Sequence, residues 1–248
     1  MYKEYKPHPY LCQYIETYWV ADGFVLDTEV HRILPDGCVD IIFALNSTSA
    51  PRMLPCIPYI VGTMTTFSEI VYHGEIRMLG IRFKPAGITS FIRTPINEFT
   101  DISVDTLSFD TILGKKFYDQ IQDIQLLEDI LHHIDTYLLE QLPYIYIKDR
   151  RIEYAVSQIE QSNGSISITD LASKSCMSKR QLERRFISDI GVSPKTYSKI
   201  IKFKNAYRFL RSFPQSTLFD MAIDCGYYDH SHLIRDFKRF SGSLPSAL

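Results

Sequence analysis

The apolar positions in the last part of the chain form one pattern that occurs twice. The first copy places them at Leu171, Ala172, Leu182 and Phe186, and the second at Met221, Ala222, Leu233 and Phe237. The offset between the copies is 50 residues before the turn and 51 residues after it. The last two apolar positions of each copy lie four residues apart, on one face of a helix. Each copy therefore predicts a short helix, a turn and a second helix.

Polar residues that cap helices support these predicted boundaries. The caps are Ser167, Ser178, Thr217 and Asp229, and Asp170, Gln181 and Asp220 stand where each would complete a capping box. The second turn holds Gly226, which allows a left-handed backbone. The first turn, Ser175-Cys176-Met177, has no glycine, so Cys176 has to accept that backbone and we expect some strain there.

A basic segment between the two copies is also predicted to be a helix. It spans Pro194–Ser212. The first helix of the unit before it is predicted at Ile168 to about Lys174, and the first helix of the unit after it follows the cap Thr217. Its apolar stripe consists of Ile200, Phe203, Ala206, Tyr207 and Leu210. A helix with such a stripe can hold the two units at a fixed separation.

The first hundred residues have a different pattern, of short apolar runs that end at turn residues. The predicted strands are His31–Leu34, Cys38–Leu45, Tyr59–Val61, Glu69–Tyr72 and Met78–Phe83. Pro35-Asp36-Gly37 separates the first two and predicts a hairpin between them. The prolines Pro51, Pro55 and Pro58 predict a loop, and Pro85-Ala86-Gly87 precedes a short predicted helix, Gly87–Arg93.

The period changes to that of a helix over residues 106–142. Apolar residues recur there at Phe117, Ile121, Ile124, Leu127, Leu131, Ile134 and Leu138. This face belongs to one helix or to two, and it serves either as a dimerisation surface or as cover for the β layer of its own domain. The range Pro143–Lys148 is the predicted linker. The fold class is thus α+β: a mainly β domain with flanking helices, residues 1–147, precedes an all-α domain, residues 148–248, of two helix-turn-helix units joined by a long helix.

Charge divides the chain in the same place. The whole protein of 248 residues has a net charge of −2, but residues 148–248 hold 17 Lys and Arg against 10 Asp and Glu. The first 147 residues hold 10 Lys and Arg against 19 Asp and Glu. A basic half suits a polyanion such as DNA, whereas an acidic half does not.

Composition indicates a protein of the cytoplasm. No apolar run approaches the roughly 18 residues of a membrane helix, and the N-terminal residues show no signal peptide. Five cysteines without paired spacing fit reduced thiols.

Two helix-turn-helix units in one chain predict that two helices enter neighbouring major grooves of promoter DNA, which recur about 34–36 Å apart. Residues near the start of each second helix are the candidates for reading bases: Lys179, Arg180, Glu183, Arg184, His230, Ser231, His232 and Arg235. The candidates for phosphate contacts are Ser178, Lys195, Lys199, Asp229, Lys238 and Arg239. Within this set, Glu183 has an alternative as an internal ion pair, and His230 and His232 have one as capping or surface residues.

The second half of the chain resembles the AraC family of bacterial transcriptional regulators. The resemblance covers about Ile152 to Pro245 and rests on ITDLASKSCMSKRQLERRF (168–186), GVSPKTYSKIIKFKNA (191–206) and AIDCGYYDHSHLIRDFKRFSG (222–242). It implies a double helix-turn-helix domain on promoter DNA, with base contacts at Arg180, Glu183 and Arg184 and at the residues 230, 231, 232 and 235. The first turn departs from the family, which commonly has a glycine near Ser175-Cys176.

The first half resembles, over RILPDGCVDIIFAL (32–45) and GIRFKPAG (80–87), a domain fused to a subset of these regulators. Such domains generally sense a signal or dimerise. We expect control through the first half, either by a small-molecule effector or by dimerisation, with a homodimer and RNA polymerase as partners beside DNA. The resemblance does not identify an effector. We expect no enzymatic activity, no cofactor, no metal and no membrane association.

Other readings of the first half remain open. Cys38 beside Asp36 and Asp40, with His31 and His73 elsewhere, has the residue types of a nucleophile and its partners. Cys12, Cys38, Cys56 and His31 have the types of metal ligands, although none of these sets has a diagnostic spacing. The aromatic residues of this half line either a ligand pocket or a core: Tyr14, Tyr18, Trp19, Phe24, Phe43, Tyr59, Phe67, Tyr72 and Phe83.

Overall fold

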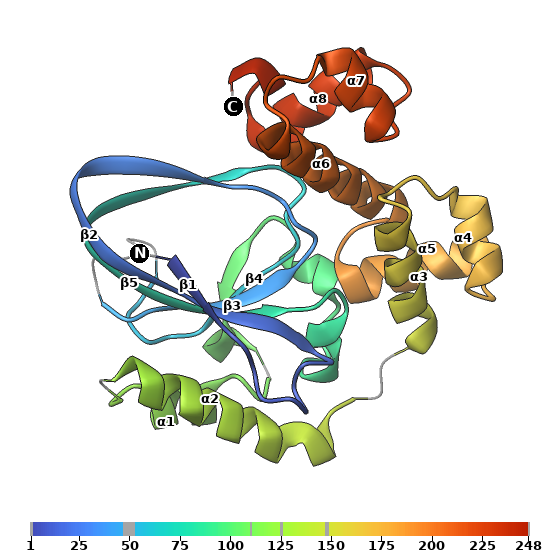
Figure 1. Ribbon diagram of the computed structural model, residues 1–248. Helices are drawn as coiled ribbons and strands as arrows, with labels where there is room; N and C mark the ends of the chain where they lie inside the picture. The colour runs from blue at the N-terminus through green and yellow to red at the C-terminus, as the bar shows by residue number, and fades with distance from the viewer. Residues whose placement is uncertain (1, 47–52, 110, 125, 147–148, 248) are drawn as a thin grey trace.

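The computed structural model describes residues 2–46, 53–109, 111–124, 126–146 and 149–247. A β-rich part with two helices beneath it is followed by a wholly helical part that packs against one end of the sheet (Figure 1). The strands are β1 (Tyr2–Tyr5), β2 (Ile15–Ile33), β3 (Val39–Ala44), β4 (Tyr59–Val61), β5 (Ser68–Phe83) and β6 (Ser103–Asp105). Short 3₁₀ turns follow at η1 (Gly87–Ser90), η2 (Ile96–Phe99), η3 (Thr106–Ser108) and η4 (Leu142–Tyr144).

The described strands form one antiparallel sheet in the order β1-β2-β5-β3-β4-β6. The predicted hairpin at Pro35-Asp36-Gly37 is wrong, because β5 lies between β2 and β3 and pairs with both. Phe83, for example, lies opposite Ile15 on one side and Val39 on the other. The predicted strands Glu69–Tyr72 and Met78–Phe83 are two stretches of this single long strand, and His31–Leu34 is only the end of β2.

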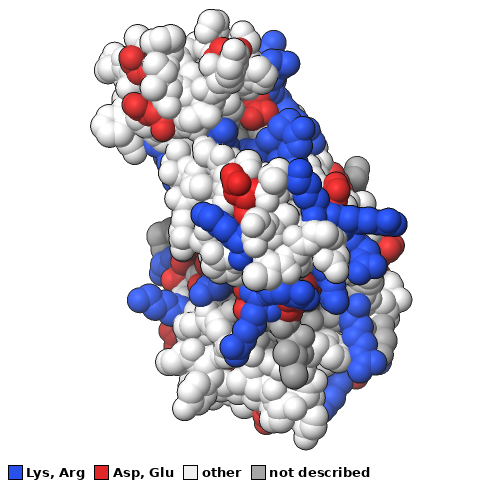
Figure 2. Space-filling model, turned by 90° about the vertical axis from the view of Figure 1, so that its right-hand side faces the viewer, with Lys and Arg blue, Asp and Glu red and all other residues white. Residues whose placement is uncertain are grey.

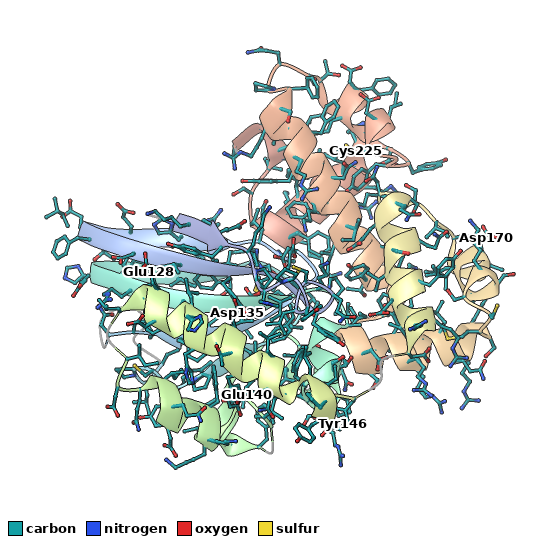
Figure 3. The ribbon with its side chains drawn as sticks, turned by 60° about the horizontal axis from the view of Figure 1, so that its bottom comes forward. Glu128, Asp135, Glu140, Tyr146, Asp170 and Cys225 are labelled. Atoms are coloured by element: carbon teal, nitrogen blue, oxygen red, sulfur yellow. The ribbon has the colours of Figure 1, made fainter. Side chains whose placement is uncertain are left out.

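The helical pattern of residues 106–142 proves to be two helices, α1 (Lys115–Ile121) and α2 (Leu127–Gln141), which lie under the sheet (Figure 1). All seven of the predicted apolar positions belong to the core between these helices and the strands. Asp135 on α2 (Figure 3) accepts hydrogen bonds from the Tyr18 hydroxyl, at 2.7 Å, and from the His8 backbone N–H, at 3.1 Å. The face therefore completes the core of its own domain, so it is not left open for a second chain.

The helical part consists of α3 (Arg150–Gln161), α4 (Ile168–Lys174), α5 (Lys179–Ile190), α6 (Pro194–Ser212), α7 (Leu218–Asp224) and α8 (His230–Ser241), then the turn η5 (Pro245–Ala247). The bounds of α4, α5 and α6 agree with the pattern in the sequence, whereas α3 was not predicted. The proposed boundary at 147 and 148, and the end of the predicted linker with it, lies outside the described residues, as does Pro51 of the predicted proline loop. The rest of the linker begins in the turn η4, and Tyr146 is held by a backbone bond to Ser90.

The long helix α6 belongs to two hydrophobic cores at once. Tyr197 and Ile201 are buried in the core of the first unit, with α3, α4 and α5. Ile200, Phe203 and Ala206 are buried in the core of the second unit, with α7 and α8. Because side chains of one rigid helix fill both cores, neither unit can rotate on α6 without opening a cavity.

Helix caps stand where the sequence placed them. Complete capping boxes are present at Ser178 with Gln181 and at Thr217 with Asp220, and the Asp229 side chain accepts from the His232 backbone N–H. The box predicted at Ser167 is incomplete, because the Asp170 carboxylate accepts from the Ser167 hydroxyl and not from its backbone N–H.

Equivalent positions in the two turns have the same backbone but different residues. Cys176 has φ of 52° and Gly226 has φ of 71°, so both adopt the left-handed conformation. That conformation costs a residue with a Cβ about 1–2 kcal/mol, so the expected strain at Cys176 is present.

The exchange Cys176→Gly is expected to raise the free energy of unfolding by about 1 kcal/mol, since relief of strain exceeds the added entropy of the unfolded chain. The matched exchange Gly226→Ala is expected to lower it by about 1–2 kcal/mol, because its Cβ would also lie 2.9 Å from the Ser165 hydroxyl oxygen. Urea unfolding of the full chain measures both, and a loss of stability in Cys176→Gly would contradict the account of the turn.

Loops of the sheet domain bind the C-terminal ends of both α5 and α8. The hydroxyls of Thr63 and Thr100 donate to the carbonyls of Ile190 and Gly191, at the end of α5. Gly191 itself has φ of +92° and is buried against this surface. The carbonyls at the end of this helix thus find hydrogen-bond donors in the other domain.

The end of α8 is held from the same domain. The Thr66 hydroxyl donates to the Arg239 carbonyl at 2.9 Å, and the Arg239 Nε donates to the Thr65 carbonyl at 3.2 Å. Arg32, on β2, donates to the Ser241 carbonyl and to the Ser243 hydroxyl. Both second helices of the repeat are therefore anchored on one sheet domain.

Two glycines allow the contribution of the contact at α5 to the free energy of unfolding to be measured. Gly191→Ala would place a Cβ 3.0 Å from the Thr100 hydroxyl oxygen and 3.1 Å from an Ile96 methyl carbon. Gly74 also has a positive φ, of +74°, but a Cβ there would meet nothing within 4 Å. Gly74→Ala therefore measures the backbone strain alone, about 1–2 kcal/mol. We expect Gly191→Ala to lose more than this in urea unfolding, and equal losses would show that the contact contributes nothing.

Candidate nucleic-acid interface

The eight side chains predicted to read bases all lie on the surface of α5 and α8. Each of them is exposed, while Leu182 and Phe186 of α5 and Leu233 and Phe237 of α8 are fully buried beneath. The inward residues fix the rotation of each helix, so the outward side chains are presented together. All eight candidate side chains are therefore accessible from solvent.

On α5 the candidates have no competing partner. Among the residues that the structure describes, Lys179, Arg180 and Arg184 form no side-chain hydrogen bond and no ion pair. The same holds for Glu183 within the described ranges, so the alternative of an internal ion pair has no support. These long side chains remain available for base edges, and Arg is the usual reader of guanine.

On α8 the start of the helix is more ordered. The Asp229 carboxylate accepts from the His232 backbone at 2.8 Å and lies 3.1 Å from its ring Nδ1, while Arg235 Nε donates to the Ser231 carbonyl at 3.3 Å. These bonds position His232 and Arg235 without burying them.

Sequence reasoning missed one residue beside α8. Tyr228 precedes the cap of the helix, is 93 % exposed, and its ring meets the His232 ring edge to face at 6.1 Å between centroids. A tyrosine fully exposed at the start of such a helix adds a hydroxyl and a flat apolar ring to the surface. Its signal in the sequence was the pair Tyr227-Tyr228, of which only the first is buried.

The phosphate candidates divide into three groups. Lys195, Lys199 and Lys238 are exposed and have no ion pair among the described residues. Ser178 and Asp229 are occupied as helix caps, and the Asp229 carboxylate would repel a phosphate. Arg239 shares its Nε with the sheet domain, which leaves the rest of its guanidinium for another acceptor.

Positive side chains gather on this side of the molecule. Figure 2 shows Lys and Arg side chains spread across the middle of the face that carries the first unit, with fewer acidic side chains between them. The excess follows from the composition of residues 148–248. A surface of this sign attracts a polyanion at long range.

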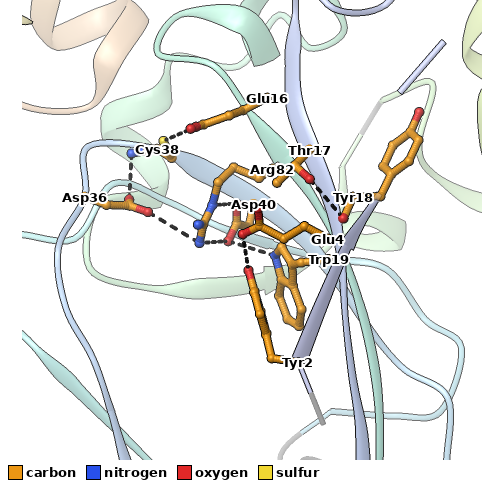
Figure 4. Close-up of polar contacts among 10 residues, drawn as sticks. All are labelled: Tyr2, Glu4, Glu16, Thr17, Tyr18, Trp19, Asp36, Cys38, Asp40 and Arg82. Atoms are coloured by element: carbon orange, nitrogen blue, oxygen red, sulfur yellow. Dashed lines mark hydrogen bonds and ion pairs between the residues drawn. The ribbon is translucent and has the colours of Figure 1, made fainter. Parts of the chain in front are cut away.

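The alternative site around Cys38 lacks a nucleophile. Cys38 is buried, and burial raises the pKa of its thiol well above the ordinary value, with Asp36, Glu16 and Asp40 raising it further. Its Sγ donates to Glu16 at 3.4 Å (Figure 4). A thiol held protonated in this way is inert, since the thiolate is the reactive form.

Two of the acids near Cys38, Asp36 and Asp40, are engaged by the partly buried Arg82 (Figure 4). Arg82 donates from Nε and from a terminal nitrogen to the two oxygens of Asp40, each at 3.1 Å, and lies 3.4 Å from Asp36. The Trp19 indole N–H also donates to Asp40, at 3.3 Å. This network ties β2, β3 and β5 together, which is a structural task.

The metal and aromatic-pocket hypotheses find no support in the structure either. Within the described ranges, no group of three or more His, Cys, Asp or Glu is placed to hold a metal ion. Tyr18, Phe43 and Phe83 are buried in the core over α1 and α2, and Phe24 is exposed. Over the part of the chain that is described, no helix has the length and apolarity needed to cross a bilayer.

Two family models match the chain. One, described as a helix-turn-helix domain, matches residues 171–248. The other, described as a domain of unknown function (DUF6597), matches residues 3–105, most of the strands of the sheet domain.

The curated relatives are bacterial regulators. An uncharacterized HTH-type transcriptional regulator of Haemophilus influenzae is 25 % identical over 154 residues, which are 62 % of this chain and 51 % of that protein. The HTH-type transcriptional regulator MtrA of Neisseria gonorrhoeae is 28 % identical over 93 residues, which are 37 % of this chain and 31 % of that protein. The matches thus span about half of the length of one relative and about a third of the length of the other.

Solved structures give weaker likenesses. A probable AraC family transcriptional regulator from Rhodopseudomonas palustris matches 40 % of this chain and 94 % of its own, with a TM-score of 0.37 and 24 % identity. ToxT from Vibrio cholerae matches 93 % of this chain and 95 % of its own, with a TM-score of 0.45 and 12 % identity.

The two equivalent arginines provide the sharpest test of this surface. Arg184→Ala and Arg235→Ala are each expected to weaken binding to a specific DNA site by about 1–3 kcal/mol, if each side chain reads a base pair. Fluorescence anisotropy at fixed salt measures the affinity for specific and for random duplexes.

The control removes one positive charge elsewhere. Lys116 is exposed on α1, under the sheet and away from α5 and α8 (Figure 1). Lys116→Ala should leave the ratio of specific to random affinity unchanged. If the two arginine variants behave like this control, α5 and α8 are not the reading helices.

Proposed function

We propose that the protein is a sequence-specific DNA-binding transcriptional regulator of the AraC type. The proposal is supported by the helix-turn-helix family model that matches residues 171–248 and by the HTH-type regulators among the relatives. In this proposal α5 and α8 enter two neighbouring major grooves of promoter DNA. Side chains near the start of each helix read base edges, and lysines around them contact phosphates.

The observation that carries the proposal is the sharing of α6 between both cores. The helix has 19 residues, which at about 1.5 Å per residue is about 28 Å of rigid rod. The units fixed along it present α5 and α8 as one body, with their exposed faces free. Major grooves on one face of DNA recur at about 34–36 Å, a spacing that suits two helices held by a rod of this length.

The sheet domain has the connections of a regulatory part. It binds the ends of both reading helices through Thr63, Thr100, Thr66 and Arg32. Any signal that changes this domain would therefore act on the orientation of the helices. We propose control through the sheet domain, by a small-molecule effector or by assembly of a homodimer.

A homodimer would need a surface other than α2. The long strands β2 and β5 project beyond the rest of the sheet (Figure 1) and carry exposed Phe24, Leu26, Val30 and Val71. These residues suit an association of two copies better than the covered face of α2 does.

RNA polymerase is proposed as a further partner. Phe219 and Ile223 on α7 are 65 % and 59 % exposed, whereas Thr169 and Ser173 hold the equivalent places in α4. Apolar side chains exposed on only one of two similar units suit a protein partner rather than DNA.

Selection of bound duplexes from a random pool by the full chain tests the proposed function. We expect two short conserved motifs whose centres lie about 10–10.5 base pairs apart, one helical turn of DNA. Arg184→Ala should relax one motif and Arg235→Ala the other. Recovery of one motif alone, or of no motif, would contradict reading by both units.

A further inference from the structure

A cavity of about 350 Å³ lies at the junction of the sheet domain and the helical part. Glu16, Asp36, Cys38 and Lys84 line it from the first, and Glu153, Glu160 and Lys204 from α3 and α6 of the second. Val156 and Pro85 add apolar surface. A volume of this size suits a small organic molecule, and one bound there would touch both domains.

The charges of this cavity have both signs, with acids in excess. Four carboxylates and two lysines face it: Glu16, Asp36, Glu153, Glu160, Lys84 and Lys204. Neither Lys84 nor Lys204 has an ion pair or a side-chain hydrogen bond within the described part of the chain, although they share the cavity with those acids. The lysines are therefore held apart from the carboxylates.

Two of the four carboxylates, Glu16 and Glu160, are positioned by hydrogen bonds from buried side chains. Glu16 accepts from the Cys38 thiol at 3.4 Å, and Glu160 accepts from the hydroxyl of buried Tyr197 at 2.9 Å. Each carboxylate has a second oxygen and further lone pairs for another donor. The Tyr197 ring also packs on Phe186 of α5, so this wall of the cavity is continuous with the core beneath the first reading helix.

We propose that this interdomain cavity binds a small basic zwitterion, a molecule with two cationic nitrogen groups and one carboxylate. The carboxylate would lie between Lys84 and Lys204, and the cationic groups would face the acids of β2 and α3. The aliphatic stem would lie on Val156 and Pro85. A purely anionic or fatty ligand is disfavoured, because carboxylates outnumber lysines in the lining of the cavity.

The consequence for regulation rests on the proposed function. A ligand that contacts Lys84 on one side and Lys204 on the other stabilises the docked arrangement, in which the ends of α5 and α8 are bound to the sheet domain. The ligand then also changes the affinity of the protein for DNA. Because linkage is reciprocal, DNA changes the affinity for the ligand by the same factor.

Isothermal titration of the full chain with L-arginine and with L-lysine tests the site. Agmatine and cadaverine, which lack the carboxylate, and L-glutamate, which lacks the second cationic group, are the comparison compounds. We expect saturable binding of at least one of the two basic amino acids and at least tenfold weaker binding of its decarboxylated form. If neither L-arginine nor L-lysine binds with a dissociation constant of about 1 mM or lower, the proposal is overturned.

Matched variants locate the binding. Lys204→Met on α6 should weaken the affinity for the amino acid at least tenfold, while Arg208→Met, which removes an exposed positive charge from the same helix, should not. If circular dichroism shows that Lys204→Met is unfolded, Glu153→Gln on α3 serves as the second variant, and it should also weaken the affinity for the amino acid. Binding that survives both Lys204→Met and Glu153→Gln places the ligand elsewhere and sinks the proposed site.

Anisotropy with the selected duplex, measured without any amino acid, separates this proposal from the proposed function. Specific DNA binding with no response to the amino acids would refute the cavity as an effector site and leave the regulator assignment intact. Amino-acid binding by a chain that binds no specific DNA would do the reverse.

Discussion

Everything in this molecule depends on the attachment of two helix ends to one sheet domain. The carbonyls at the end of a helix have no partner within the helix. Here threonine hydroxyls and Arg32 of the sheet domain donate hydrogen bonds to several of these carbonyls. Each such bond contributes about 1 kcal/mol, but their placement matters more than their sum. They hold α5 and α8 at their C-terminal ends, which leaves the N-terminal starts of both helices, with the side chains proposed to read DNA, exposed.

A second constraint acts through α6, whose buried side chains belong to both cores. The two units are therefore joined twice, through α6 and through the sheet domain. If the two units were joined only by α6, the angle between α5 and α8 would depend only on packing in the two helical cores. With the second attachment that angle also depends on the sheet domain, and Ala86 and Leu34 of that domain pack directly into the two helical cores. The acidic half of the protein thereby gains influence over a surface it does not form.

The internal repeat lets the chain act as its own comparison. The left-handed turn is present in both units, and a glycine relieves it in one while Cys176 bears it in the other. The outer face of the first helix is polar in one unit, at Thr169 and Ser173, and apolar in the other, at Phe219 and Ile223. Since the folds of the units agree, these differences have no origin in the fold.

The sequence by itself determined most of the helical half but not α3. It determined the bounds of α4, α5 and α6, the caps at Ser178, Thr217 and Asp229, and the outward placement of the candidate readers. Helix periodicity and capping are local, so residues three or four apart carry the information. Only the tertiary structure decided the strand partners of β5, the burial of Cys38, the covering of the α2 face and the exposure of Tyr228. These depend on pairings between segments distant in the chain, such as Val39 with Phe83, which no local pattern encodes. The docking of Gly191 on Thr100 is of the same kind, because it needs two domains to be folded before their surfaces can meet.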